Sequence, residues 1–440
     1  MSSTSLQVAY ITSGAAGMYC GSCLNDNTLA RALMRAGVDV QLIPTYTPIR
    51  TDEPDVSAPR IFFGGINVYL EQKSRLFRAL PAKMTRWLDN RRLLNWVTAR
   101  ALARSYSDLG PLTVSMLDGA LGHQKREVEQ LIDWLANHVR PDVVHFSNLL
   151  IAGCISELRR QCKASIVLTL QGDDIFLDSL PEPYRSQAID RMRKLVPLVD
   201  RFTVHSRFYQ ALMMERLGIP ESKFARLPLT IDVNDFAATP APSKDTSKRV
   251  LGYLARLAPE KGLGQLVDAF LRLKRLPNMG DVELRIAGWL GEQHREYAET
   301  QFAKLNDGGL RDQWRYVGEV DRKSKVEFLR GLDLFCVPAT FLEPKGIYLL
   351  EALAAGVAVV APEHGAFPEL LAATHGGRLC APNDVKDLTA ILATLLANAH
   401  DRRQFAHAGQ TFVHSECNAR VGAERLVKLY GELRASREGG

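Results

Sequence analysis

Short apolar runs alternate with longer amphipathic segments along most of the chain. In the first half, the runs that predict strands span residues 7–12, 38–43, 143–146, 165–170 and 201–204. In the second half, they span residues 249–255, 283–287, 314–317, 332–337 and 357–360. Many of these runs lack alternation of polar and apolar side chains, which is typical of parallel strands buried on both faces. With helical segments between them, for example 263–273 and 349–355, they predict an α/β fold with two doubly wound parallel sheets.

The pattern also indicates where the chain divides. Residues 237–248 are rich in alanine, proline, serine and threonine and show no periodicity, which predicts a linker. We therefore expect one domain at 1–237, completed by a C-terminal helix at 418–440, and a second at 248–417. Residues 46–120 do not follow the alternation of strands and helices, and we interpret them as an insertion in the first domain. Two domains also suit the length of 440 residues, because a single core stops growing at about 250–300 residues.

The charge of the chain is mildly positive and unevenly distributed. The formal net charge of +6 is too small to predict a nucleic-acid partner. Within 73–104, however, nine basic side chains accompany one acidic side chain, with tryptophans interleaved. One interpretation is a basic amphipathic surface that binds anionic lipid or an acidic acceptor. The other is a pair of solvated helices that pack their tryptophans on the core.

The sequence also bears on location. It contains no signal-peptide pattern at the N-terminus and no run of about 18 uncharged apolar residues. The seven cysteines are an odd number, and several lie in apolar runs, as reduced thiols do. We expect a cytoplasmic protein, peripheral to the inner face of the membrane if 73–104 binds lipid.

Cys20 and Cys23 form a lone Cys-x-x-Cys. Without a second cysteine or histidine pair, a zinc or redox role is poorly supported.

The loop after the strand at 332–337 carries the strongest chemical signal. Glu343 precedes a predicted helix and Glu351 lies within its first two turns. Both carboxylates can face one crevice beyond the carboxyl end of the sheet, where open parallel sheets bind ligands. The backbone N–H groups near Gly346 and Ile347 are available there to an anion. Carboxylates suit sugar hydroxyls because they only accept hydrogen bonds, although acids near a helix start are also common for structural reasons.

A second loop carries basic residues in a matching position. Arg256 and Lys261 follow the strand at 249–255 and precede the helix at 263–273. The positive end of the helix dipole is unfavourable for a positive charge at the start of a helix. A bound diphosphate would offset this unfavourable interaction at Lys261. The alternative is a pair of solvated basic side chains.

Together these residues resemble the donor site of glycosyltransferase family 4. The resemblance rests on Arg-x4-Lys at Arg256 and Lys261 and on Glu-x7-Glu at Glu343 and Glu351. It extends over the second half of the chain and parts of the first, including Asp232, which is similar to the aspartate before the family's linker. It implies the GT-B fold, in which two Rossmann-like domains face a central cleft, and transfer of a sugar from a nucleoside-diphosphate sugar with retention of anomeric configuration. The acceptor would be a glycan or a lipid-linked sugar.

The resemblance also implies roles for individual residues. The expected catalytic residues are Glu343, Arg256, Lys261 and Gln171. The expected nucleotide-binding residues are Gly21, Gly346, Ile347, Tyr348 and Glu351. The sequence contains no Asp-x-Asp, and Arg256 and Lys261 can replace the charge of a metal ion. We therefore expect no metal and no cofactor beyond the donor substrate.

The first half of the chain offers fewer signals. Gly21 lies in a glycine-rich segment, 14–23, that is not Gly-x-Gly-x-x-Gly, so a nicotinamide site is poorly supported. Asp173 and Asp174 either contact the acceptor or cap the next turn. We interpret His145, at the end of a strand, as a core histidine.

Some residues depart from the family pattern and keep other functions open. Gln171 stands where a histidine is frequent, Lys345 where an aromatic residue is usual, and His364 in place of a glycine. A nucleotide-sugar epimerase would use Asp173 or Asp174 as an acid or base. A binding-only relative would follow from the loss of the histidine.

Overall fold

The computed structural model describes residues 5–14, 21–59, 61, 109–238 and 248–438. Internal contacts divide the chain into two compact units, Met1–Leu227 with Gly422–Gly440, and Pro228–Val421. The segment after Leu227 packs with the second unit, because Ile231 forms a β-bridge with Asn418 and the Arg322 guanidinium contacts the Asp235 carboxylate at 2.8 Å. The domain limits expected from the sequence, 1–237 with 418–440 and 248–417, stay a prediction.

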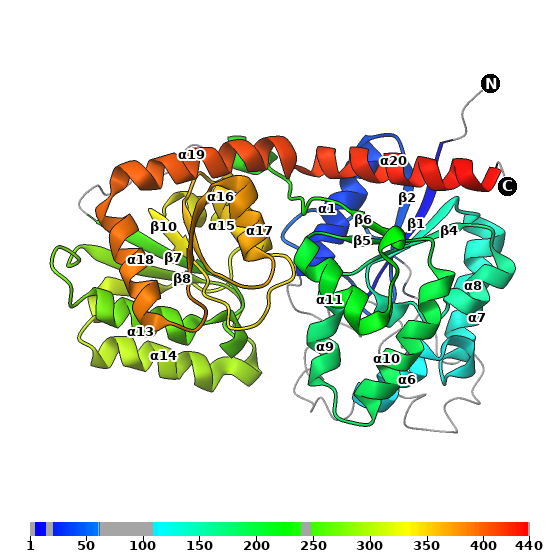
Figure 1. The fold of residues 1–440 in the computed structure, drawn as a ribbon, viewed down its shortest axis with the longest axis horizontal. Coiled ribbons are helices and arrows are strands. Elements are labelled where there is room, and N and C mark those ends of the chain that lie inside the picture. The colour runs from blue at the N-terminus through cyan, green and yellow to red at the C-terminus, as the bar shows by residue number, and fades with distance from the viewer. Residues whose placement is uncertain (1–4, 15–20, 60, 62–108, 239–247, 439–440) are drawn as a thin grey trace. The chain divides into compact units, whose positions relative to one another are not determined.

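Within its described residues, the first unit contains a six-stranded parallel sheet in the order β2-β1-β3-β4-β5-β6 (Figure 1). Its strands are β1 (Gln7–Thr12), β2 (Asp39–Pro44), β3 (Val143–Phe146), β4 (Ser165–Thr169), β5 (Arg201–Val204) and β6 (Phe224–Arg226). The strand order changes direction at β1, which pairs with both β2 and β3. Loops that leave the carboxyl ends of strands at such a point form ligand sites in open sheets.

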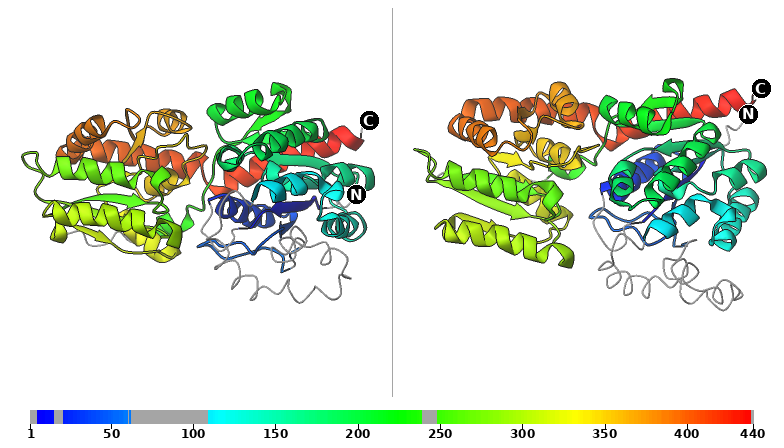
Figure 2. Two further views of the ribbon diagram at one scale, coloured as in Figure 1. Left: turned by 90° about the horizontal axis from the view of Figure 1, so that it is seen from below. Right: turned by 60° about the horizontal axis from the view of Figure 1, so that its bottom comes forward.

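Helices surround this sheet. They are α1 (Gly21–Arg35), α6 (Leu109–Leu117), α7 (Lys125–Trp134), α8 (Ile155–Gln161), α9 (Asp173–Ser179), α10 (Tyr184–Leu195) and α11 (Arg207–Leu217). The start of α11 is encoded locally, because the Ser206 hydroxyl accepts a hydrogen bond from the Tyr209 N–H. The last helix, α20 (Ala419–Glu438), runs alongside the first unit (Figure 2), where the Tyr430 hydroxyl bonds to Nδ1 of His145.

The second unit contains, within its described residues, a six-stranded parallel sheet in the order β12-β11-β10-β7-β8-β9. Its strands are β7 (Arg249–Leu254), β8 (Val282–Ala287), β9 (Trp314–Tyr316), β10 (Leu334–Cys336), β11 (Val359–Pro362) and β12 (Gly377–Cys380). The strand order reverses between β7 and β10, which pair directly through Leu251 and Leu334. The loops after these two strands therefore emerge side by side.

The second sheet is covered on both faces, with α13 and α14 on one side and α16 and α17 on the other (Figure 1). Its helices are α12 (Asn234–Ala238), α13 (Leu263–Leu273), α14 (Arg295–Asp307), α15 (Arg322–Arg330), α16 (Ile347–Ala354), α17 (Phe367–Thr374), α18 (Val385–Ala397) and α19 (Ala399–Glu416). Helix α19 packs on α16 and α17. Among the described helices of both units, none combines the length and apolar character needed to cross a bilayer.

The two doubly wound parallel sheets predicted from the sequence are confirmed. Two strands were missed, β6 and β12, which lie at sheet edges and are only three and four residues long. Helix α1 begins at Gly21, and its first turns carry polar side chains that give no clear apolar periodicity. The predicted insertion at 46–120 is described only in part, and its basic segment 73–104 lies outside the described residues.

Candidate functional site

Two loops meet at the carboxyl edge of the second sheet, and a lysine from one forms an ion pair with a glutamate from the other. Nζ of Lys261, from the loop after β7, lies 2.7 Å from Oε2 of Glu343, from the loop after β10. The Tyr348 hydroxyl donates to the same carboxylate oxygen at 3.1 Å. The loops are also joined by their backbones, since the Thr340 N–H donates to the Glu260 carbonyl at 2.9 Å. Residues 82 positions apart in sequence are thus neighbours, because β7 and β10 are adjacent.

This ion pair is largely shielded from solvent. The side chains of Lys261 and Glu343 are 13% and 7% exposed. Burial raises the pKa of the Glu343 carboxyl, but the nearby positive charges of Lys261 and Lys345 and the Tyr348 hydrogen bond outweigh it, so the pKa is below its ordinary value. Glu343 is therefore an ionised acceptor at neutral pH. The Lys261 ammonium also lies 4.5 Å from the centre of the Phe341 ring, a favourable cation–π distance.

The start of α16 adds an anion-binding element beside this pair. Gly346 is the N-cap, and its φ of +81° is a left-handed conformation that favours glycine. The first N–H groups of a helix, here from Ile347 onward, have no intrahelical acceptor. Tyr348 and Glu351 are three residues apart on α16 and so share one face of the helix.

Glu351 has two basic partners that the sequence pattern did not indicate. It forms an ion pair with Lys325, a buried residue of α15, and its Oε1 lies 3.9 Å from Nη1 of Arg322. The same arginine donates to the Asp232 carbonyl, so the segment before the linker is fixed to α15. The described contacts thus place positive charge beside both glutamates of the Glu-x7-Glu pair.

Arg256 lies on the same loop as Lys261 and has a carboxylate partner from that loop. Its Nη2 lies 3.3 Å from Oε1 of Glu260, and both side chains are 36% exposed. The structure therefore brings Lys261 and Glu343 together with Tyr348, while Arg256 pairs with a carboxylate of its own loop. A diphosphate would have to compete with Glu260 for this guanidinium.

In the first unit, Gln171 lies after β4 and is 4% exposed. Its side-chain amide nitrogen donates to Oδ1 of Asp26 at 3.1 Å and to the Ser147 carbonyl at 2.8 Å. Asp26 lies on α1 and is fully buried, although no motif of the sequence marks it. Gly21 is the first residue of the same helix.

The other polar residues singled out in the first half have structural partners. Oδ1 and Oδ2 of Asp173 accept hydrogen bonds from the backbone N–H groups of Leu149 and Gln171 at 2.7 and 3.1 Å, and burial raises the pKa of Asp173 to about 6. Asp174 accepts from the Tyr209 hydroxyl at 2.6 Å. These contacts make Asp173 and Asp174 organisers of the loop after β4, and they do not favour an epimerase.

His145 is confirmed as a core histidine. It is 1% exposed, and its Nε2 lies 2.7 Å from the Thr169 hydroxyl, in addition to its bond with α20. Burial lowers its pKa to about 3, so the ring stays neutral near pH 7.

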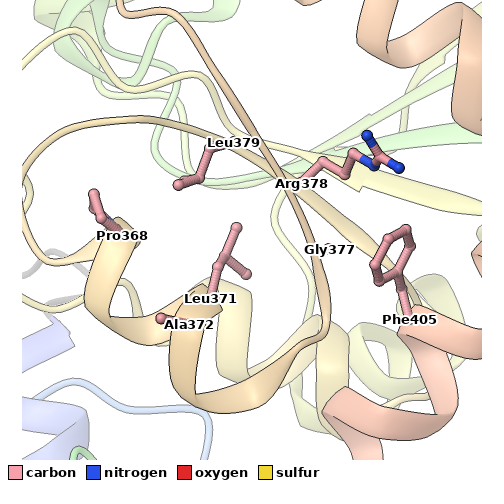
Figure 3. Close-up of a pocket in the computed structure, with 7 residues that line it drawn as sticks. All are labelled: Pro368, Leu371, Ala372, Gly377, Arg378, Leu379 and Phe405. Carbon is pink, nitrogen blue, oxygen red and sulfur yellow. The ribbon is translucent and has the colours of Figure 1, made fainter.

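A separate hollow on the second unit does not fit the expected ligand (Figure 3). It lies among α17, β12 and α19, and its walls are formed by Pro368, Leu371, Ala372, Gly377, Arg378, Leu379 and Phe405. This lining is apolar apart from Arg378 and includes none of the residues expected to bind the donor. A diphosphate would find a single cation there.

Gly262, which follows Lys261, is a position where substitution should be costly. Its φ is +73°, and a Cβ atom would lie 1.8 Å from the Pro338 carbonyl oxygen. Gly262→Ala is expected to destabilise the protein by at least about 1–3 kcal/mol, the usual cost of forcing a residue with a side chain into such a conformation. Chemical denaturation of the variant measures this, with Gly309→Ala as the control for positive φ without a nearby backbone atom. Equal losses in the two variants would contradict the close approach to Pro338.

Two family models match the chain in succession. The model described as Glycosyltransferase Family 4 matches residues 97–235, and the model described as Glycosyl transferases group 1 matches residues 236–412. Between them they cover both parallel sheets from β3 onward, including the Lys261–Glu343 pair. The chain belongs to glycosyltransferase family 4.

Several mannosyltransferases are similar to the chain over part of their length. The phosphatidyl-myo-inositol mannosyltransferase of Mycolicibacterium smegmatis is 34% identical over 221 residues, 49% of this chain and 53% of that protein. The GDP-mannose-dependent monoacylated alpha-(1-6)-phosphatidylinositol monomannoside mannosyltransferase of Corynebacterium glutamicum is 25% identical over 61% of this chain and 71% of its own. The chain thus spans about half the length of the first of these relatives.

Solved structures show the same fold. Sucrose-phosphate synthase from Thermosynechococcus elongatus superposes with a TM-score of 0.67 at 17% identity, over 98% of this chain and all of that one. HepE of Anabaena, in complex with UDP and glucose, gives a TM-score of 0.66 at 15% identity, over 97% of this chain and all of that one. The GT-B class expected for a family 4 chain is confirmed at the level of its two Rossmann-like domains.

Proposed function

We propose that this chain transfers a sugar from a nucleoside-diphosphate sugar to a hydroxyl group of an acceptor. The single observation that supports this most strongly is the shielded Lys261–Glu343 pair beside the N-terminus of α16. Such a site offers a cation and helix N–H groups to a diphosphate, and an ionised carboxylate to the hydroxyls of a sugar. The membership of family 4 supports the same conclusion.

Each residue has a role in this proposal. Lys261, with Arg256 once it leaves Glu260, neutralises the diphosphate and the charge that develops on it. Glu343 accepts hydrogen bonds from the transferred sugar and orients its anomeric carbon, while Glu351 holds the ribose diol. Backbone N–H groups at Gly346 and Ile347 and the hydroxyl of Tyr348 complete the donor site. Groups that are fixed before the reaction stabilise such charge without reorganisation.

The proposed reaction retains the anomeric configuration. The bond between the anomeric carbon and the diphosphate oxygen breaks, and a bond to the acceptor oxygen forms on the same face of the sugar. The acceptor proton passes to the departing phosphate oxygen. This route requires no carboxylate nucleophile of the kind used by retaining glycosidases.

The relatives suggest the first donor and acceptor to test. Two of them are named as GDP-mannose-dependent enzymes that act on phosphatidylinositol derivatives, which makes GDP-mannose and a lipid-linked or glycan hydroxyl the first choices. A cytoplasmic location with peripheral membrane contact through 73–104 belongs to the same proposal.

Removal of metal ions is expected to leave the activity unchanged. Lys261 and Arg256 supply the positive charge that a divalent ion would otherwise bring to the diphosphate. Initial rates before and after dialysis against EDTA measure this. The rate is then measured again after Mg²⁺ is added back. A loss on chelation that Mg²⁺ restores would contradict this expectation.

The proposed function is tested by a panel of nucleotide sugars in a thermal-shift assay, followed by release of nucleoside diphosphate with candidate acceptors. We expect one nucleotide sugar to raise the melting temperature and to be consumed only when an acceptor is present. Stabilisation without turnover with any acceptor would instead indicate a binding-only protein. Turnover of the sugar without release of nucleoside diphosphate would indicate an epimerase.

A further inference from the structure

A buried hydrogen-bond cluster surrounds Gln171 at the point where the strand order of the first sheet changes. Oδ1 of Asp26 accepts from the Tyr10 hydroxyl at 3.2 Å and from the Gln171 amide at 3.1 Å. Oδ2 accepts from the Thr12 hydroxyl at 2.7 Å. Tyr10, Thr12 and Asp26 are each 0% exposed, so the carboxylate is held by donors from β1 and from the loop after β4.

The chemistry of these partners fixes the orientation of the Gln171 amide. A carboxylate and a carbonyl only accept hydrogen bonds, so the amide nitrogen must face Asp26 and Ser147. Both N–H bonds of that nitrogen are then used, and Oε1 is directed away from the two acceptors. Burial and then the charge of Asp26 raise the pKa of Tyr10 well above its ordinary value, so the Tyr10 hydroxyl remains a donor to Asp26.

The backbone of Gln171 is held as firmly as its side chain. Its N–H donates to Oδ2 of Asp173 at 3.1 Å, and the next N–H, from Gly172, donates to the Tyr209 hydroxyl at 2.9 Å. Gly172 has a φ of +112°, which lets the chain turn sharply from β4 into α9. The amide is therefore preorganised before any ligand arrives.

We propose that Asp26 is a positioning residue, which holds the Gln171 amide so that Gln171 presents a carbonyl oxygen to a ligand. This inference rests on the proposed function, and it specifies the chemistry of the contact. Gln171 accepts a hydrogen bond from a sugar hydroxyl and neither donates one nor takes up a proton. A carbonyl oxygen has two lone pairs, so the Gln171 oxygen can accept one hydrogen bond from this hydroxyl and another from a protein donor. The hydroxyl belongs to the transferred sugar or to the acceptor.

The decisive variant is Asp26→Asn, which keeps the shape and replaces an acceptor with an amide that can also donate. Only the Ser147 carbonyl then requires a donor from the Gln171 amide, so the orientation in which the nitrogen faces the ligand becomes accessible to part of the molecules. We expect kcat/KM to fall by about tenfold or more, the usual consequence of leaving a buried hydrogen-bonding group mismatched. Thr12→Val is the matched control, because it removes another hydrogen bond of Asp26 and leaves the contact with Gln171; we expect a change below about threefold.

A double-mutant cycle separates positioning from a general loss of stability. In a Gln171→Ala background, Asp26→Asn is expected to have almost no further effect on kcat/KM, while its effect on the melting temperature persists. Equal effects on kcat/KM in both backgrounds would show that Asp26 acts on the fold and would overturn the proposal.

Two binding arms identify the source of the hydroxyl. If the hydroxyl belongs to the transferred sugar, Asp26→Asn lowers the affinity for GDP-mannose in calorimetry and leaves the affinity for GDP unchanged. If it belongs to the acceptor, both nucleotides bind as in the wild type and only the acceptor KM rises. No change in any of these quantities would overturn the proposal.

A ligand-independent measurement distinguishes failure of this inference from failure of the proposed function. Nuclear magnetic resonance of the Gln171 side-chain amide should show two protons that exchange slowly with solvent in the wild type and rapidly in Asp26→Asn. If neither GDP-mannose nor any other nucleotide sugar binds the wild type, the proposed function fails, and the exchange rates still decide the role of Asp26. Rapid exchange of these protons in the wild type would overturn the positioning role of Asp26.

Discussion

Replacement of Glu343 by alanine is expected to lower kcat by about 10²–10³, the range seen when one preorganised electrostatic group is removed from an active site. The carboxylate is buried, ionised and fixed by Lys261 and Tyr348, so it can orient a sugar without reorganising. Binding of the nucleoside diphosphate alone should change much less, because Glu343 is assigned to the sugar. Steady-state kinetics with the donor found in the thermal-shift panel, together with calorimetry of the free nucleotide, measure both effects.

Two companion variants make the result specific. Glu343→Gln keeps the size of the side chain and removes its charge, and it should lose most of the same activity. Glu363→Gln changes an exposed glutamate that follows β11 and should retain wild-type rates. A kcat near that of the wild type in Glu343→Ala would remove Glu343 from the catalytic machinery.

Replacement of Lys261 by alanine is expected to weaken donor binding by about 10–100-fold, since a hydrogen bond between charged groups contributes about 1.5–3 kcal/mol. The loss should appear for the nucleotide sugar and for the nucleoside diphosphate alike, because Lys261 is assigned to the phosphates. Calorimetric titration of both ligands measures it. This equal loss contrasts with the sugar-specific loss expected for Glu343.

The Lys261 variant also removes the partner of a buried carboxylate. Breaking a buried ion pair typically destabilises a protein by about 3–5 kcal/mol, so stability must be measured in parallel. Lys261→Ala/Glu343→Ala, which leaves neither charge unpaired, should be more stable than Lys261→Ala and equally impaired in binding the nucleoside diphosphate. Lys323→Ala, at an 84% exposed side chain, is the control; wild-type affinity in Lys261→Ala would contradict the phosphate role.

Much of the fold could be predicted because most of its strands are continuous apolar runs. β1, β3 and β5 have the bounds expected from the sequence, whereas β6 and β12 are short edge strands whose polar residues hide the pattern. Lys261 and Glu343 could be expected to meet, since parallel strands on either side of a switch point send their loops to one place.

The remaining contacts depend on tertiary structure that no spacing encodes. Lys325 and Arg322 reach Glu351 from α15, and neither belongs to a motif around the glutamates. Asp26 lies in a polar stretch, Asn25 to Thr28, that reads as an exposed helix start. It is buried because the start of α1 packs on β1, where Tyr10 and Thr12 donate to it.

The most direct measurement is a crystal structure of the protein with the nucleotide sugar that stabilises it. The diphosphate should lie within hydrogen-bond distance of the Lys261 ammonium and the first N–H groups of α16, with ribose hydroxyls on Glu351 and sugar hydroxyls on Glu343. A nucleotide bound anywhere else on the second unit, with the Lys261–Glu343 pair left unchanged, would contradict the assignment of this loop pair as the donor site.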